Sequence, residues 1–255
     1  MKLFDMTGQV AVITGSSRGI GLAIAHAMAE AGASVVVSSR KADACDAAVA
    51  EINAAVGRDA AAACPANIAS KDDLHNLVRF AETTLGPITA LVCNAASNPY
   101  FGPMAGIADE QFLKILQNNV LSNHWLINMV APGMVERGAG SITVVSSIGG
   151  LKASTVIGAY NISKAADLQL VRNLAAEYGP SGVRVNAICP GLIRTDFARA
   201  LWENPDILKL STAGSALKRI GEPDEIAGMA VFLAANAGRF TTGQAMVIDG
   251  GATIM

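Results

Sequence analysis

The feature that most constrains this chain is a series of about seven short apolar runs separated by segments of helical length. The runs are nearly free of polar residues, whereas a half-exposed strand would alternate polar and apolar side chains. Strands of this kind have both faces covered by helices, as in a parallel sheet. We therefore predict a Rossmann-type, doubly wound α/β fold with strands at Val10–Ile13, Val35–Ser38, Ala60–Cys64, Ala90–Cys93, Ile142–Ser146, Val183–Ile188 and Ala245–Ile248.

The chain of 255 residues predicts one domain, 1–255, because no repeat, low-complexity tract or linker divides it. Its 51% hydrophobic residues can fill one large core. The longest stretch without a strand signal runs from Gly191 to Gly243, and its first part, residues 192–221, reads as irregular. Such an insertion after a strand predicts a lid over a site, followed by a helix that starts near Glu222.

Charge and composition exclude several classes of function. A net charge of −2 with 16% charged residues offers no basic field for nucleic acid, so we expect a small-molecule substrate. No segment approaches the roughly 20 apolar residues of a membrane span, so we expect a cytoplasmic protein without membrane contact. The four cysteines lie far apart and the three histidines form no cluster, which predicts reduced thiols and no metal site.

A glycine-rich turn follows the first predicted strand. It reads Thr14-Gly15-Ser16-Ser17-Arg18-Gly19-Ile20-Gly21 and leads into an apolar helical run. Glycines at such a turn let the backbone approach a ligand closely, and the N–H groups at the start of the helix bind phosphate. The spacing Gly-x-x-x-Gly-x-Gly differs from the Gly-x-Gly-x-x-Gly fingerprint of many dinucleotide-binding proteins.

Tyr160 and Lys164 lie four positions apart in a predicted helix, so both can project from one face. An ammonium group beside a phenol favours the phenolate and lowers its pKa from the ordinary value of about 10. The pair could therefore be an acid/base. Taken alone, a Tyr-x-x-x-Lys pair is usually a buried ring with a lysine that extends to solvent.

With these motifs the chain resembles the short-chain dehydrogenase/reductase family, whose glycine motif is Thr-Gly-x-x-x-Gly-x-Gly. The family's other motifs occur in the same order, as Asn94-Ala95-Ala96 and Pro190-Gly191-Leu192-Ile193-Arg194-Thr195. The resemblance implies a catalytic set of Asn119, Ser147, Tyr160 and Lys164, with Asn118 as an alternative to Asn119 one residue away. In that set Tyr160 donates the proton, Ser147 orients the carbonyl, Lys164 lowers the phenol pKa and holds a ribose hydroxyl, and Asn119 supports a water relay.

The resemblance also implies a nicotinamide cofactor. No acidic residue ends the second strand, where one would bind the ribose hydroxyls of NAD. Arg18, Arg40 and the Ser39 hydroxyl could instead bind a 2′-phosphate, so we expect NADP(H), with NAD(H) as the weaker alternative. The expected cofactor-binding residues are Gly15, Ser17, Arg18, Gly19, Ile20, Gly21, Ser39, Arg40, Asn67, Ile68, Asn94, Ala95, Ala96, Tyr160, Lys164, Pro190, Gly191, Ile193 and Thr195.

The substrate-side stretches are similar to those of the NADPH-dependent retinal and carbonyl reductase branch, which implies an apolar ketone, aldehyde or secondary alcohol. The aromatic and aliphatic side chains expected there are Tyr100, Phe101, Leu192, Phe197, Leu201 and Trp202. Two alternatives stay open: a 3-oxoacyl-carrier-protein reductase and a dinucleotide-binding sensor without turnover. The family resemblance and the apolar long helices predict a homotetramer.

Overall fold

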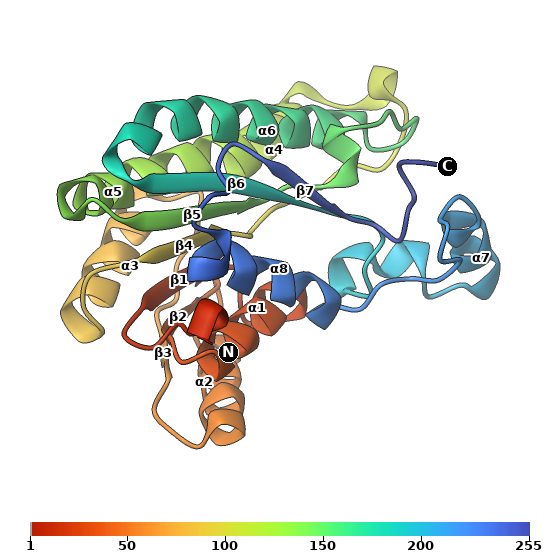
Figure 1. Ribbon diagram of the computed structural model, residues 1–255. Helices are drawn as coiled ribbons and strands as arrows, with labels where there is room; N and C mark the ends of the chain where they lie inside the picture. The colour runs from red at the N-terminus through yellow and green to blue at the C-terminus, as the bar shows by residue number, and fades with distance from the viewer. Residues whose placement is uncertain (1) are drawn as a thin grey trace.

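The computed structural model describes residues 2–255, and its centre is one parallel sheet. The strand order is β3-β2-β1-β4-β5-β6-β7, and every neighbouring pair is parallel (Figure 1). This confirms the predicted doubly wound fold. The strands are β1 (Val10–Thr14), β2 (Ser34–Ser38), β3 (Ala61–Ala63), β4 (Ala90–Cys93), β5 (Gly140–Val145), β6 (Val183–Pro190) and β7 (Ala245–Ile248).

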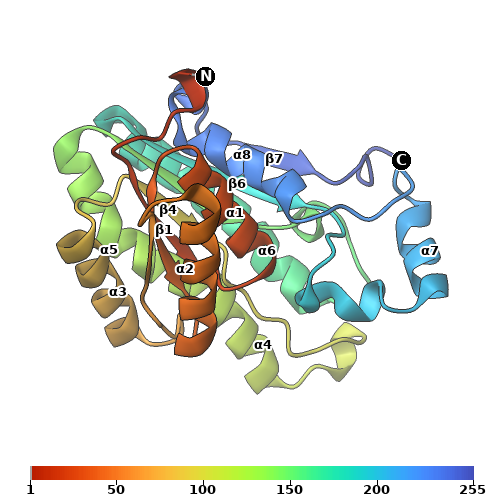
Figure 2. The same ribbon diagram turned by 90° about the horizontal axis from the view of Figure 1, so that it is seen from below.

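Helices cover both faces of the sheet (Figures 1 and 2). One face carries α1 (Gly19–Glu30), α2 (Ala42–Val56) and α8 (Asp224–Ala234), and the other carries α3 (Lys71–Thr84), α4 (Asp109–Leu116), α5 (Ser122–Arg137) and α6 (Gly158–Tyr178). A π-helical turn, Gln117–Leu121, joins α4 to α5. Short 3₁₀ turns lie at Lys2–Phe4, Met104–Gly106, Ile148–Gly150, Gly179–Ser181, Asp196–Leu201 and Asn236–Gly238.

The two apolar cores explain why the strands are mainly apolar. Along β1, Ala11 and Ile13 pack into the core with α1 and α8, whereas Val12 packs into the core with α3, α5 and α6. All three side chains are fully buried. Successive residues of a strand face opposite sides, so a sheet covered on both sides requires apolar residues at every position.

Several element boundaries differ from the prediction, as does the segment 192–221. Strand β3 has only three residues and β6 continues to Pro190, because β7 pairs with it as far as that position. The segment 192–221 is also less irregular than expected, since it contains helix α7 (Pro205–Ala213). The Asn204 side chain caps α7 by accepting a hydrogen bond from the backbone N–H of Asp206 at 2.8 Å, and Pro205 occupies the first turn.

The strand order positions a site at the carboxyl ends of β1 and β4. The chain runs outward from β1 to β3 in one direction and from β4 to β7 in the other, so the loops after β1 and β4 diverge. Ligands of doubly wound folds bind in the crevice at such a point. Helix α7 extends beyond the layers at the same side of the molecule as the C-terminus (Figures 1 and 2).

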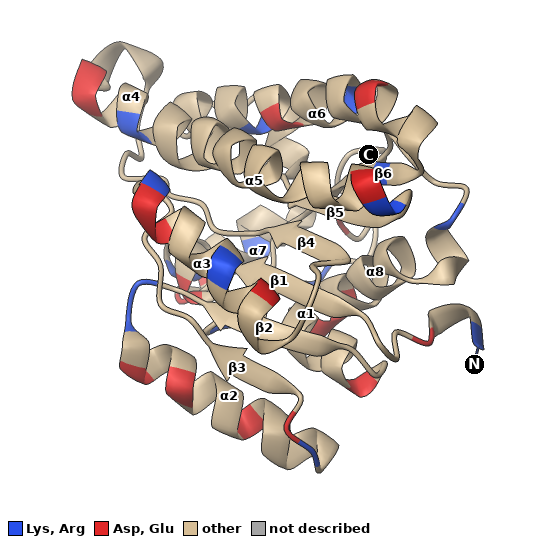
Figure 3. Ribbon diagram, turned by 90° about the vertical axis from the view of Figure 1, so that its left-hand side faces the viewer, with Lys and Arg blue, Asp and Glu red and all other residues tan. Residues whose placement is uncertain are grey.

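Charged residues are dispersed over the outer helices. In the view of Figure 3, α3 carries both basic and acidic residues, whereas the charged residues of α2 are all acidic. Within residues 2–255, no helix combines the length and the apolar character needed to span a membrane. No group of three or more His, Cys, Asp or Glu side chains in the same part of the chain could hold a metal ion.

Candidate active site

The glycine-rich loop after β1 adopts a conformation that depends on its glycines. Gly15 and Gly19 have φ values of +66° and +58°, in the left-handed region that favours glycine. A Cβ on Gly21 would lie 2.6 Å from the Asn94 amide nitrogen. This amide donates to the carbonyls of Thr14 and Gly15 at 2.9 and 3.1 Å, so Asn94 supports the loop from the neighbouring strand end.

The loop ends at an N-terminus of α1 that has no side-chain cap. Arg18 occupies the N-cap position in an extended conformation, and its side chain forms no capping hydrogen bond. The first N–H groups of a helix have no partner within the helix, and they favour an anion. This start of α1 therefore fits the phosphates of a dinucleotide.

A cleft of about 1330 Å³ extends from this loop across the carboxyl ends of the strands. Its volume exceeds the roughly 300–1000 Å³ of an ordinary small-ligand pocket, so it can hold a cofactor and a substrate together. Each of the residues expected to bind the cofactor lines this cleft, from Gly15 in the glycine loop to Thr195 at the base of the lid.

Three of the four expected catalytic residues also line the cleft. Ser147 follows β5, and Tyr160 and Lys164 lie in the first two turns of α6. The Ser147 hydroxyl accepts a hydrogen bond from the backbone N–H of Gly149 at 3.0 Å, which fixes its position at the strand end. The ammonium nitrogen of Lys164 lies 5.7 Å from the centre of the Tyr160 ring.

Asn119 lies beneath the cleft rather than on its surface, and it is fully buried. Its amide oxygen accepts from the backbone N–H of Ser97 at 2.8 Å, and its amide nitrogen donates to the Ser97 carbonyl and the Ser163 hydroxyl, each at 3.0 Å. Asn119 thus fixes the loop after β4 to helix α6. Its neighbour Asn118 lines the cleft and donates to the Ser97 hydroxyl at 3.0 Å.

Burial changes the acid strength of the tyrosine. Desolvation raises the pKa of Tyr160 above its ordinary value, while the Lys164 ammonium and the Ser147 side chain act to lower it. The effect expected of Lys164 is present, but burial outweighs it in the protein without ligand. Tyr160 is therefore fully protonated at neutral pH and can donate a proton.

The side chains expected at a 2′-phosphate have different surroundings. Arg18 and Arg40 both line the cleft, and Arg40 is exposed without an ion pair to any residue of 2–255. Arg18 instead forms an ion pair with Asp196, in the segment expected to be a lid, at 3.1 Å. The Ser39 hydroxyl lies 3.2 Å from the sulfur of Cys45, and the exposed Asn67 accepts from the backbone N–H of Ala69 at 3.1 Å.

The six apolar side chains expected around the substrate divide into two groups. Leu192, Phe197 and Leu201 line the cleft, and the Phe197 ring lies 5.9 Å from the Tyr160 ring between centres. The prediction was wrong for the other three, which are absent from the lining. The other three are Tyr100, Phe101 and Trp202. The Tyr100 hydroxyl donates to the Pro103 carbonyl and the Trp202 indole N–H donates to the Thr195 carbonyl, each at 2.8 Å. Phe101 is exposed.

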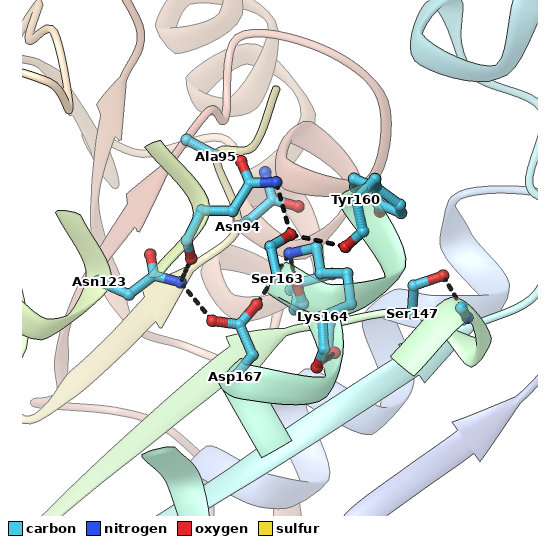
Figure 4. A network of polar contacts seen from close by, with 12 residues as sticks. Asn94, Ala95, Asn123, Ser147, Tyr160, Ser163, Lys164 and Asp167 are labelled. Carbon is cyan, nitrogen blue, oxygen red and sulfur yellow. Dashed lines mark hydrogen bonds and ion pairs between the residues drawn. The ribbon is translucent and has the colours of Figure 1, made fainter. Parts of the chain in front are cut away.

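Several polar residues behind the cleft were missed by sequence reasoning. Ser163 accepts from Asn119 and donates to the Tyr160 carbonyl at 2.7 Å. Asn123 and Asp167 form a further buried layer next to Lys164 (Figure 4). Asn123 lies four residues after Asn119 and Asp167 three after Lys164, so each shares a helix face with an expected catalytic residue; this spacing was the signal that could have revealed them.

Comparisons with known sequences identify the relatives of this chain. The sequence model of the family described as enoyl-(acyl carrier protein) reductase matches residues 15–253. Dehydrogenase/reductase SDR family member 4 from Bos taurus is 41% identical over 246 residues, which cover 96% of this chain and 88% of the relative.

Solved structures show the same fold. A 7α-hydroxysteroid dehydrogenase, complexed with NADH and 7-oxo glycochenodeoxycholic acid, superposes with a TM-score of 0.93 at 36% identity, covering 98% of this chain and 96% of that one. A gluconate 5-dehydrogenase from Burkholderia cenocepacia J2315, in complex with NADP and tartrate, gives 0.94 at 29% identity, covering 100% and 98%. These two neighbours hold different cofactors and chemically different ligands.

Proposed function

This chain belongs to the short-chain dehydrogenase/reductase family, and from that premise we propose that it is an NADP(H)-dependent reductase of apolar ketones and aldehydes. The family is one of oxidoreductases that use nicotinamide dinucleotides. The observation that carries the proposal is one cleft bordered by the glycine loop, by Tyr160 and Lys164, and by the apolar side of the lid.

The proposed proton donor is Tyr160. Hydride attack on a carbonyl leaves negative charge on its oxygen, so a proton must arrive as that charge develops. Tyr160 is protonated at neutral pH because burial raises its pKa, and it lies on the cleft beside Ser147. The Ser147 hydroxyl accepts from the backbone N–H of Gly149, so its own proton can be donated to the same carbonyl oxygen.

The residues present fit a dinucleotide. The uncapped start of α1 and the left-handed glycines form a cradle for its phosphates, and Lys164 would hold a ribose hydroxyl. When bound, the nicotinamide dinucleotide supplies the hydride for carbonyl reduction and takes it up in alcohol oxidation. Preference for NADP(H) is supported by Arg40, which lines the cleft at the end of β2 where NAD-binding proteins carry an acidic residue.

The proposed substrate class follows from the lid. Leu192, Phe197 and Leu201 contribute apolar surface, and Phe197 lies next to the reacting tyrosine. Polar residues also line the cleft, among them Ser97 and Asn118. A carbonyl with an aromatic or long aliphatic portion can bury that portion against the lid, whereas a sugar would leave hydroxyl groups without partners there.

The basic residues nearest the lid are engaged within the chain, which weighs against a carrier protein docking there. An acidic carrier needs uncompensated basic residues near the site. Arg194 pairs with Glu222 at 2.9 Å, Arg199 pairs with Asp196, and the Lys152 ammonium donates to the Ala252 carbonyl at 3.2 Å. A sensor without turnover, in turn, has no use for Ser147, Tyr160 and Lys164 along one cleft.

The test is NADPH oxidation, followed by absorbance, with a panel of carbonyl compounds. We expect kcat/KM to be higher for aromatic ketones and long-chain aldehydes than for acetoacetyl thioesters or small sugars. The Tyr160→Phe variant is the matched control, because it keeps the ring and removes the proton donor. A preference for the thioester or sugar contradicts the substrate class, and no turnover of any carbonyl contradicts the proposed activity.

A further inference from the structure

The catalytic lysine has a buried carboxylate partner that the mechanism above does not use. Asp167 lies three residues after Lys164 in α6, and its side chain has no exposed surface. The Lys164 ammonium donates to Asp167 Oδ2 at 3.0 Å and to the Val145 carbonyl at 2.9 Å. An ammonium group has three N–H donors, so one remains for a ligand in the cleft.

The second carboxylate oxygen of Asp167 is also occupied. The Asn123 amide donates to Asp167 Oδ1 at 3.1 Å and to the backbone carbonyl of Asn119. In Figure 4, Asp167 and Asn123 lie on one side of Lys164, and Tyr160 and Ser147 lie on the other. Helices α5 and α6 therefore hold the carboxylate in a fixed orientation toward the ammonium.

Stability alone is a poor explanation for this arrangement. Taking two charges out of water costs about as much as their attraction returns, and apolar replacements of buried ion pairs are often neutral or stabilising. Lys164, however, has a role that requires its charge. Burial disfavours the ammonium form, and a nearby negative charge favours it.

We propose that Asp167 is a positioning residue that acts through Lys164, keeping this ammonium charged and fixed beside Tyr160. The inference rests on the proposed function, since that function makes Tyr160 the proton donor. Asp167 itself is fully buried and does not line the cleft, so it reaches the reacting atoms only through Lys164.

Within residues 2–255, few titratable groups face the pair formed by Lys164 and Asp167. Besides Tyr160, Lys164 and Asp167, they are the thiols of Cys93 in β4 and Cys189 in β6, and burial raises the pKa of both. Desolvation raises the pKa of Tyr160. It acts to lower the pKa of Lys164, but Asp167 and Tyr160 act in the opposite direction, and the pKa of Lys164 is raised overall. The charge of Asp167 acts to raise the pKa of both groups. Desolvation also raises the pKa of Asp167, and the Lys164 ammonium and the Asn123 amide act to lower it.

The expected direction of the pH shift in Asp167→Asn is the same whether Tyr160 or Lys164 releases the first proton. Tyr160 and Lys164 titrate as a coupled pair, and carbonyl reduction requires both of them protonated. Asp167→Asn removes one negative charge but keeps an oxygen that can accept from Lys164. The pair then loses its first proton at lower pH, by about 1 pH unit or more, as expected for a charge removed from hydrogen-bond distance.

The first experiment measures kcat/KM for carbonyl reduction with NADPH as a function of pH. We expect the alkaline limb of Asp167→Asn to move to lower pH relative to the wild type. Glu177→Gln is the matched control, because it removes an exposed carboxylate from the same helix at a distance from Lys164. An unchanged limb in Asp167→Asn, with or without a lower Tm, overturns the proposal, because a purely structural role moves stability alone.

The second experiment does not require turnover. The phenolate absorbance of the cofactor-free wild type minus that of Tyr160→Phe reports the titration of Tyr160. We expect its midpoint above the ordinary value of about 10, and a lower midpoint after Asp167→Asn. A wild-type midpoint below that value overturns the proposal even if the Asp167 variant does not fold. Absence of activity with a midpoint that shifts as expected would instead contradict only the proposed function.

Discussion

Arg18 and Asp196 form an ion pair that connects the glycine loop to the lid. Their nitrogen and oxygen lie 3.1 Å apart, and Arg199 approaches the other oxygen of the same carboxylate at 2.6 Å. The pKa of Asp196 lies below its ordinary value, chiefly through the hydrogen bond from Arg199. The carboxylate is therefore ionised at neutral pH, and the contact is lost only as pH falls through that lowered pKa. While Asp196 is ionised, its carboxylate pairs with Arg18, one of the arginines that the sequence analysis assigns to the 2′-phosphate.

Asp196→Asn should strengthen NADPH binding, because it leaves Arg18 available to a phosphate. Exposed ion pairs are weak, so the expected gain in affinity is at most about fivefold. NADH affinity should change little, since NADH lacks the phosphate. Both dissociation constants can be measured by titration calorimetry.

Glu203→Gln is the control for this prediction, since Glu203 belongs to the same lid segment but forms no ion pair with Arg18. Equal gains for NADPH and NADH in Asp196→Asn would mean that the ion pair affects the lid as a whole and not the phosphate site.

Ser39→Asp should reverse the cofactor preference. A carboxylate at the end of β2 can accept hydrogen bonds from ribose hydroxyls and repels a 2′-phosphate. The native enzyme should favour NADPH by at least about tenfold in kcat/KM, since one charge-assisted phosphate contact contributes roughly 1.5 to 3 kcal/mol. Steady-state kinetics with both cofactors checks this, and equal use of NADH by the native enzyme would refute the role of the arginines.

The sheet could be predicted from sequence because each buried strand is marked by the apolar residues of its own short segment. A strand covered on both faces is mainly apolar, and the buried strands β1 and β4 follow this rule within one residue of the predicted ends. Helix α7 was not predicted, because nine residues give too little periodicity and its start depends on the single cap Asn204. Short elements are defined by such individual contacts.

The cleft residues could also be predicted, since the family motifs lie at strand ends that a parallel sheet brings to one edge. The layer behind them could not. Asn123 and Asp167 lie on helices, where polar residues usually face water, and they are buried only because α5 and α6 pack side by side. That proximity is a property of the tertiary structure, so only the structure reveals the partner of Lys164.

Phe197→Ala should weaken the reduction of aromatic carbonyls by at least about tenfold in kcat/KM, because it removes the ring nearest to Tyr160. Phe101→Ala is the matched control. The two phenylalanines are similarly exposed, 59% and 60%, but Phe101 does not line the cleft. Equal losses in both variants would place the aromatic part of the substrate elsewhere.

Tyr160→Phe should abolish turnover and leave NADPH affinity nearly unchanged, because the ring stays packed and only the phenol oxygen is removed. Tyr178→Phe, at the end of the same helix, should retain full activity. Turnover and cofactor binding are measured on the same preparations. More than a few per cent of activity left in Tyr160→Phe would show that another group donates the proton.

The chain should form a homotetramer, and the long helices should supply one of its interfaces. Leu113 of α4, Leu121 of the π-helical turn and Ile162 of α6 are 64%, 42% and 46% exposed, which leaves apolar surface for a second copy to cover. Light scattering at micromolar concentration should give the mass of four chains, and Ile162→Glu should reduce it by placing a charge in the interface. Leu210→Glu on helix α7 is the control, since Leu210 is 77% exposed on the lid and its substitution should leave the mass unchanged. A monomeric mass for the native chain would show that this apolar surface remains in contact with water.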